Sequence, residues 1–306
     1  MDTRGAGVGW AVVHARVVSP ERQEQLAALR RAGVRFIGMT SDMCFPDLDE
    51  FDPLDYGALC EGWCHCFREP DRHLPPDPPR ALISASDFTD WHTVVPETAL
   101  RVEAPSFDFV YVGATAPWKQ PAKGWDLARR CIPRLSDELG LRGLLVDTPA
   151  EHTWPGTVRT GPLPWRELMA HLARARFAFL PNALDASPRV LTEALCLDVP
   201  VVVNRRILGG WKYVNSFTGV FFDGPDDVVA AARACLDRER APRAWFRANH
   251  GPYLAGQRLG RFLGELDPAL AARCADRLGA RARSRPPGPL SLRLAAKIDP
   301  SPIDAR

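Results

Sequence analysis

The sequence lacks any long apolar run, and its opening residues lack the apolar core of a secretion signal. No apolar stretch approaches the ~18 residues that a membrane-spanning helix needs. Residues 1–5, Met-Asp-Thr-Arg-Gly, hold one large apolar side chain, that of Met1. These absences argue against export and membrane insertion. We therefore expect a cytoplasmic protein with no transmembrane segment, and leave peripheral attachment to a membrane open.

An excess of charge is also lacking, and so is the cysteine spacing of a metal site. The 39 Lys and Arg residues nearly balance 37 Asp and Glu residues, so no general field attracts nucleic acid. Eight cysteines are present, and Cys60, Cys64, His65 and Cys66 lie together, but not as the CxxC or HxxxH pairs whose ligands converge. We expect reduced, packed thiols, with neither a metal nor a disulfide framework.

What the sequence does have is a succession of short apolar runs separated by amphipathic stretches. Its 306 residues, 46% hydrophobic and 25% charged, suit a soluble protein with room for two domains. Strand candidates at 10–18 and 34–39 flank a helix predicted over 20–31, which together make one βαβ unit, and another short strand is expected at 81–84. The pattern predicts an α/β fold with parallel strands.

The most informative stretch runs from 177 to 203, where an apolar run, a helical pattern and a β-branched run follow one another. Ser187 is a suitable N-cap for the helix and Pro188 suits its first position. The amides of Arg189 and Val190 would then leave a helix N-terminus at the carboxyl end of a strand. Such an end is a ready site for an anion, and the Arg189 side chain adds charge to it.

Two acidic residues eight positions apart, Asp185 and Glu193, bracket this helix start. The segment resembles the EX7E segment of the retaining GT-B glycosyltransferases of family 4, the group 1 type. The likeness covers roughly residues 107 to 237. Its other matching segments are Thr160-Gly161-Pro162-Leu163, Glu167-Leu168, Ala175-Arg176-Phe177, Gly209-Gly210 and the expected loop at 218–221.

The resemblance implies a GT-B-like fold of two Rossmann-like parallel-sheet domains, of which the N-terminal one is reduced. We expect that reduced, acceptor-side domain at 1–104, because the first hundred residues hold fewer strands than such a domain normally has. The nucleotide-sugar-binding domain is expected at 105–266, with its last helix, predicted over 245–266, packing back on the first domain. Residues 267–306 are predicted to be a disordered tail.

The resemblance also implies an activity, the transfer of a sugar from a nucleotide diphosphate sugar with retention of configuration. The acceptor is an unknown glycan, lipid or small molecule, which places the enzyme in glycan biosynthesis. The implied catalytic residues are Lys123 and Arg189 on the diphosphate and Asp185 on the sugar hydroxyls, while Glu193 holds the ribose. No protein nucleophile, metal or other cofactor is needed, because positive charge and helix amides stabilise the leaving diphosphate.

Further donor contacts are expected around these residues, and two weaker candidates lie on the acceptor side. Where the family has an Arg after its Val-Gly, this chain has Ala114. Lys123, which opens the Lys-Gly pair, is favoured over Lys119 as the lysine that contacts the diphosphate. The remaining donor-binding candidates are Ser187, Val190, Gly113, Gly209, Gly210 and Lys119. On the acceptor side, His14 could face the substrate, although a lone His at a strand end is more often structural. Ser41 could bond a sugar but cannot shuttle a proton.

Two other functions fit the same scaffold. A sugar-nucleotide epimerase would share the donor site. A non-catalytic sugar-nucleotide or glycan-binding protein is favoured by Ala114, by Asp185 in place of the usual Glu, and by the short first domain.

Overall fold

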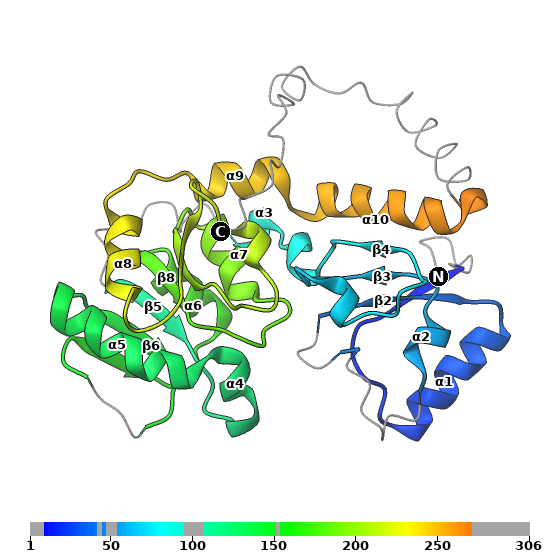
Figure 1. Cartoon of the computed structure of the whole chain (residues 1–306), viewed down its shortest axis with the longest axis horizontal. Coiled ribbons are helices and arrows are strands. Elements are labelled where there is room, and N and C mark those ends of the chain that lie inside the picture. The colour runs from blue at the N-terminus through cyan, green and yellow to red at the C-terminus, as the bar shows by residue number, and fades with distance from the viewer. Residues whose placement is uncertain (1–8, 42–44, 47–53, 95–106, 151–153, 271–306) are drawn as a thin grey trace, which may run out of the picture. The chain divides into compact units, whose positions relative to one another are not determined.

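The computed structural model of the chain describes residues 9–41, 45–46, 54–94, 107–150 and 154–270 (Figure 1). The chain divides into two compact units, Met1–Leu259 and Gly260–Arg306, and both sheets lie in the first. Every described strand pair is parallel, which confirms the predicted α/β class. Among the described helices, none is long and apolar enough to cross a membrane.

The first sheet has four strands in the order β1-β2-β3-β4. Its elements are β1 (Trp10–Val13), α1 (Pro20–Arg31), β2 (Arg35–Met39), α2 (Tyr56–Leu59), β3 (Trp63–Cys64), η1 (Pro70–Arg72), β4 (Arg80–Ala81), η2 (Ala85–Phe88) and α3 (Trp91–Val94). The helix α1 has its predicted bounds, but the strands predicted over 10–18 and 81–84 are shorter. The strand β1 stops at Val13, where His14 ends the apolar run, and β4 pairs with β3 over only two residues.

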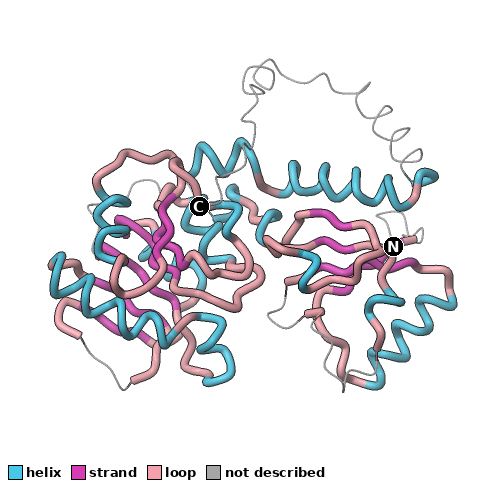
Figure 2. Tube along the Cα trace, in the orientation of Figure 1, coloured by secondary structure: helices cyan, strands magenta, loops and turns pink. Residues whose placement is uncertain are grey.

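The second sheet has six strands in the order β10-β9-β8-β5-β6-β7. Figure 2 shows the strands of the chain in magenta and its helices in cyan. Its strands are β5 (Phe107–Val112), β6 (Gly143–Val146), β7 (Thr157–Thr160), β8 (Ala175–Leu180), β9 (Val201–Asn204) and β10 (Gly219–Phe222). A short 3-10 helix, η4 (Pro117–Lys119), leads into the first of its helices. These helices are α4 (Gln120–Lys123), α5 (Trp125–Leu139), α6 (Trp165–Leu172), α7 (Arg189–Cys196) and α8 (Val228–Leu236). The expectation of a loop at 218–221 is wrong, because β10 covers most of this segment and pairs with β9 at the edge of the sheet.

Helices cover both faces of this sheet, as the alternation along β5 requires. Val110 faces one core, which also holds Leu172 of α6 and Leu191 of α7. Phe109 and Tyr111 face the other core, where α5 and α8 pack against them. All five side chains are almost fully buried. The middle of the strand is therefore apolar and buried on both faces, whereas Asp108 near its start pairs with Arg176.

The final helical stretch departs from the prediction. A single helix was expected over 245–266, whereas two occur, α9 (Pro242–Asn249) and α10 (Pro252–Leu266). The break lies at His250, which is extended, and at Gly251, whose φ of 103° no helix contains. The Gly251 amide donates to the backbone oxygen of Asp87 at 2.9 Å, so contacts with a distant segment stop the helix here.

The strand order of the second sheet reverses between β5 and β8. From β5 the chain builds outward through β6 and β7, then returns to β8 beside β5 and builds the other way through β9 and β10. The loops that leave the carboxyl ends of β5 and β8 therefore lead to opposite sides of the strand order, and such a switch point is where open α/β sheets bind ligands. Gly124 brings the two loops together there: a Cβ on it would lie 2.0 Å from the backbone oxygen of Pro181.

This contact makes a prediction about stability. Gly124 and Gly140 have the same left-handed conformation, with φ of 66° and 63°, but a Cβ at Gly140 would meet no other described atom within 4 Å. We expect Gly140→Ala to lower the free energy of unfolding by about 1–2 kcal/mol, the strain of that conformation. Gly124→Ala should lose about 1–3 kcal/mol more, since it also overpacks a backbone contact. Urea unfolding of the two variants checks this, and equal losses would mean that the loop approach is not constrained.

Candidate functional site

The strongest polar contact at the switch point joins two of the sequence-predicted catalytic residues. Lys123, at the end of α4, places its Nζ 2.8 Å from Oδ2 of Asp185, in the loop after β8. The two side chains are 28% and 13% exposed, so water screens the pair only partly. Val112, Pro188 and Val190 lie around it. The space left between them is about 10 Å³, room for roughly one water molecule.

The fold holds Lys123 in place through its backbone. The hydroxyl of Tyr111, on β5, donates to the Lys123 backbone oxygen at 3.1 Å. The Ala183 amide donates to the Ala122 backbone oxygen at 3.3 Å, and Gly124 closes against Pro181 immediately afterwards. The lysine is therefore fixed to both β5 and β8, and only its side chain is free to follow a ligand.

The Asp185 carboxylate accepts two further hydrogen bonds from its own loop. Asn182 Nδ2 donates to Oδ2 at 2.9 Å, and the Ser187 amide donates to Oδ1 at 3.3 Å. Asn182 was not among the predicted site residues. An Asx-type turn of this kind orients the carboxylate toward Lys123 and fixes the approach of the chain to α7.

Ser187 does not cap α7 as predicted. Its hydroxyl accepts from the Ser86 amide at 2.9 Å and bonds the Ser86 hydroxyl at 2.7 Å, so no side chain caps the helix. The helix begins at Arg189, one residue later than expected, and Leu191 makes the first backbone bond, to Pro188 at 3.1 Å. The amides of Arg189 and Val190 precede that bond, as an anion-binding helix start requires.

Glu193 and Arg189 lie one turn apart on α7. Glu193 also contacts a residue that the sequence did not single out. Trp165 Nε1 donates to Glu193 Oε1 at 2.9 Å. Burial raises the pKa of Glu193 above its usual value, while the Trp165 bond and the charges of Arg189 and Lys123 oppose the rise. The field of Lys123 reaches Glu193, so both acidic residues and both cations share one electrostatic site.

The glycines predicted to cradle the donor have packing roles in the structure. The Gly209 amide donates to the Asp185 backbone oxygen at 3.0 Å, and a Cβ on Gly209 would lie 1.8 Å from the Ala186 backbone oxygen. A Cβ on Gly210, whose φ is 84°, would meet Pro188 at 2.6 Å. Gly113 directly follows β5, and a Cβ there would approach Thr148 at 2.9 Å. These close contacts bring the loop after β9 against the Asp185 turn.

The remaining candidates lie away from the ion pair. Lys119 is exposed, with its Nζ 4.8 Å from the centre of the Trp118 ring. His14 and Ser41 are brought together at the carboxyl ends of β1 and β2, where the Ser41 hydroxyl donates to the His14 backbone oxygen at 2.9 Å. The serine hydroxyl is thus engaged, and the His14 side chain is exposed. A contact of either with an acceptor stays a prediction.

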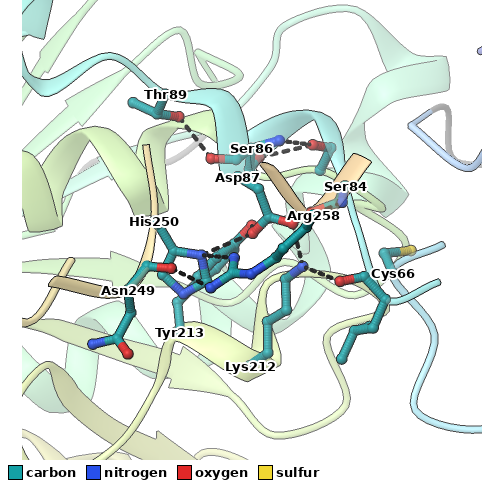
Figure 3. A network of polar contacts seen from close by, with 12 residues as sticks. Cys66, Ser84, Ser86, Asp87, Thr89, Lys212, Tyr213, Asn249, His250 and Arg258 are labelled. Atoms are coloured by element: carbon teal, nitrogen blue, oxygen red, sulfur yellow. Dashed lines mark hydrogen bonds and ion pairs between the residues drawn. The ribbon is translucent and has the colours of Figure 1, made fainter. Parts of the chain in front are cut away.

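A buried polar network connects the segment 84–89 with residues far along the chain (Figure 3). Asp87 is fully buried, and Oδ2 accepts from Lys212 Nζ at 2.6 Å and from the Ser84 amide at 2.9 Å. Oδ1 accepts from the Tyr213 hydroxyl at 2.8 Å and lies 3.0 Å from His250 Nδ1. Burial raises the pKa of Asp87, but the bonds and charges of His250 and Lys212 outweigh it and hold the pKa below its usual range.

The same segment contacts α7 through hydroxyl groups. Besides the Ser86 to Ser187 bonds, the hydroxyls of Thr89 and Thr192 are 2.7 Å apart. Asp87 was not among the predicted site residues. The signal was present as a capping box, in which Ser84 and Asp87 bond each other's backbone.

The cysteine cluster forms no metal site among the described residues, in which no suitable group of ligands occurs. Cys60, Cys64 and Cys66 are buried free thiols. Burial raises the pKa of Cys60 to about 12 and that of Cys66 to about 11, so both stay protonated. The expectation of packed thiols is confirmed for these three; Cys44 lies outside the described residues.

Comparison with known proteins gives a result for the fold. No protein-family model and no curated protein matches the chain. Solved structures do: AviGT4, a glycosyltransferase involved in avilamycin A biosynthesis, aligns with a TM-score of 0.55 and 18% identity over 86% of this chain and 76% of its own. The chain has the GT-B fold. This confirms the predicted fold class, whereas identities this low leave the finer family assignment as a prediction.

Two further structures with the fold are similar over most of this chain. Sucrose-phosphate synthase from Thermosynechococcus elongatus gives a TM-score of 0.56 and 12% identity over 79% of this chain and 71% of that one. The pneumococcal O-GlcNAc transferase GtfA, in complex with UDP and GlcNAc, gives a TM-score of 0.52 and 11% identity over 85% of this chain and 56% of that one. In a GT-B fold, the switch point with Lys123 and Asp185 lies where an open α/β sheet binds ligands.

The buried network generates a stability prediction. Asp87→Asn removes the counter-charge of Lys212 inside the protein, and breaking a buried pair in this way costs about 3–5 kcal/mol of unfolding free energy. Because the folded pKa of Asp87 is lowered, its contribution is present above the unfolded value of ~3.9 and is lost as pH falls further. Guanidinium unfolding at pH 7, and again at about pH 2.5, below the unfolded value, measures both effects.

Asp71→Asn is the matched control, since Asp71 pairs with Arg80 while 91% exposed. An exposed ion pair of this kind contributes about 0–1 kcal/mol to the free energy of unfolding. If the two variants unfold alike, the Asp87 network is not the buried support that its geometry indicates.

Proposed function

We propose that the protein is a retaining glycosyltransferase that moves a sugar from a nucleotide diphosphate sugar to an acceptor hydroxyl. The observation that carries the proposal is the Lys123–Asp185 pair at the switch point of the GT-B sheet, beside the start of α7. A donor lying across this point would meet, in order, a carboxylate for sugar hydroxyls, a lysine for the diphosphate, and Glu193 for the ribose.

The reaction follows from where charge develops. The bond between the anomeric carbon and the diphosphate oxygen breaks, and the diphosphate leaves with the bonding electrons. The acceptor oxygen forms its new bond to the same carbon on the same face, and its proton passes to the leaving diphosphate. Lys123, Arg189 and the first amides of α7 stabilise the negative charge as it grows, which lowers the barrier without a protein nucleophile.

The ion pair gives Asp185 a second part in this scheme. In the described conformation the Asp185 carboxylate pairs with the Lys123 ammonium group at 2.8 Å, and almost no empty space is left around the pair. A bound diphosphate competes with Asp185 for the lysine, after which the released carboxylate accepts hydrogen bonds from the sugar. Donor binding and placement of the sugar are thereby coupled through one side chain.

The proposal includes no metal ion, because two cationic side chains and a helix start already supply positive charge. The chain has one Asp-X-Asp triplet, Asp47-Leu48-Asp49, of a kind that can hold a divalent cation with a diphosphate. It lies outside the described residues. Activity measured with and without a chelator decides whether it takes part.

A second function is favoured by one observation. The residue at the position where the resemblance expects an arginine, just after β5, is Ala114, which is 3% exposed. An alanine brings no positive charge to this position. A protein with this loss would bind a nucleotide sugar without transferring it. The epimerase alternative differs again, because it would change the donor sugar with no acceptor present.

The test begins with UDP-, GDP- and ADP-sugars as donors, read by thermal shift and by release of nucleoside diphosphate. We expect one donor class to bind and to be hydrolysed slowly in water without added metal. Binding with no release would indicate a binding protein, and a changed sugar would indicate an epimerase. If no donor stabilises the protein, the proposal fails.

Two lysine variants then test the mechanism. Lys123→Ala should slow release of the diphosphate about 10²-fold or more, the usual effect of removing one group that stabilises developing charge. Lys119→Ala is the control, because Lys119 lies exposed over Trp118 and away from the pair. Its rate should stay within about threefold of the parent. Equal small losses in both variants would remove Lys123 from the proposed role.

The raised pKa of Glu193 predicts how donor binding depends on pH. The ribose hydroxyls donate to the ionised carboxylate, so UDP binding should weaken as pH falls toward the raised pKa. The terminal phosphate of UDP also titrates near ~6, but it does so identically for parent and variant. Glu193→Gln should therefore bind UDP more weakly at pH 7.5 and lose affinity less steeply down to pH 5. Calorimetric titrations that give parallel pH profiles would contradict the assignment.

A further inference from the structure

A second cavity lies beside the proposed donor site and has no part in the mechanism above. It measures about 330 Å³ and is lined by residues from 67–73, after β3, and from 205–208, after β9, together with Asp223. Both segments leave the carboxyl ends of parallel strands. The loop after β9 continues into Gly209, whose amide bonds the Asp185 turn. The cavity therefore adjoins the sugar end of the donor site.

The cavity has an excess of positive charge. Four of its lining residues are arginines and two are carboxylates. Arg205 pairs with Asp223 at 3.0 Å, and Arg72 pairs with Glu69 at 2.6 Å. Arg68 and Arg206 form no ion pair with any described residue. Two guanidinium groups thus remain uncompensated in a chain whose formal net charge is only +2.

Arg68 is held in this arrangement by aromatic rings. Its guanidinium lies 5.2 Å from the Trp211 ring centre and 5.5 Å from that of Phe221, and Arg205 lies 5.3 Å from the same Phe221 ring. The Trp211 indole in turn donates to the Cys66 backbone oxygen at 2.8 Å. Burial lowers the pKa of Arg68, and so does the nearby charge of Arg205. A bound anion would relieve this repulsion.

We propose that the cavity binds an oxyanion, a phosphate or carboxylate group, carried by the sugar acceptor. The inference rests on the proposed transferase function and names the class of its second substrate. Guanidinium groups match both oxyanions through paired N–H donors. The donor diphosphate is assigned to Lys123 on the other side of Asp185, so an anion here belongs to a different molecule. It anchors the acceptor while a neutral hydroxyl of the same molecule reacts.

The experiment uses the whole protein saturated with UDP, or with GDP or ADP where the protein binds that diphosphate instead, so that the donor position is filled. Inorganic phosphate, glucose 6-phosphate, glucuronate and glucose are titrated in turn by calorimetry. We expect the phosphate probes, the carboxylate probe, or both to bind, and glucose to bind at least tenfold more weakly. The relative affinities of glucose 6-phosphate and glucuronate identify the preferred oxyanion.

Single variants assign the binding to the cavity. Arg206→Gln and Arg68→Gln should each weaken the bound oxyanion about tenfold, and Arg68→Lys should weaken it less because the charge is kept. Arg206 touches no ring in the described contacts, so its variant is informative even if Arg68→Gln unfolds. The control is Arg159→Gln, an exposed arginine of β7 at the far edge of the sheet, which should bind the probes as the parent does.

The outcomes separate this inference from the function on which it rests. If none of UDP, GDP and ADP binds the parent, the proposed function fails. If UDP binds but the arginine variants take the oxyanion as the parent does, or if glucose binds equally well, the cavity proposal is wrong. Loss of UDP affinity in Arg206→Gln, or displacement of phosphate by UDP, would assign the arginines to the donor instead.

Discussion

The buried carboxylate of Asp87 is the interaction on which the arrangement of the described residues depends. An ionised group with no exposure is tolerated inside a protein only when charge and hydrogen bonds replace water. Lys212, Tyr213, His250 and a backbone amide supply these, from three segments far apart in sequence. The requirement also explains why the last helical stretch is interrupted at His250, since a continuous helix would carry that ring elsewhere.

The proposed donor site depends on a second, less buried charge pair. Lys123 and Asp185 come from the loops that leave β5 and β8, and the pair exists because the sheet reverses its order between those strands. The backbone contact at Gly124 brings these two loops within reach of each other, and the contact at Gly209 packs the loop after β9 against the Asp185 turn. In the proposed mechanism the lysine and the carboxylate then exchange partners. Rigid backbone around an exchangeable pair is the arrangement that a site needs if it must bind a charged molecule and release it.

Sequence reasoning predicted the class, the parallel strands and most helices because these depend on apolar periodicity within one segment. It placed α1 at the bounds that the structure has. It failed where a distant segment decides the local structure. Ser187 is a good N-cap in isolation, but its hydroxyl bonds Ser86 instead. No local pattern reveals a partner 101 residues away. For the same reason Trp165 and Asp87 were missed, whereas Lys123 and Asp185 were selected because a family pattern carries long-range information.

The bonds between the segment 84–89 and α7 have a consequence for how the protein responds to its solution. Ser86 with Ser187 and Thr89 with Thr192 join through hydroxyl groups that carry no formal charge. Dissolved ions screen exposed charge pairs such as Arg31 with Glu24, but have little influence on bonds between neutral groups. The contact of this segment with the start of α7 should therefore persist unchanged from dilute buffer to concentrated salt, even as the surface of the protein loses its ion pairs.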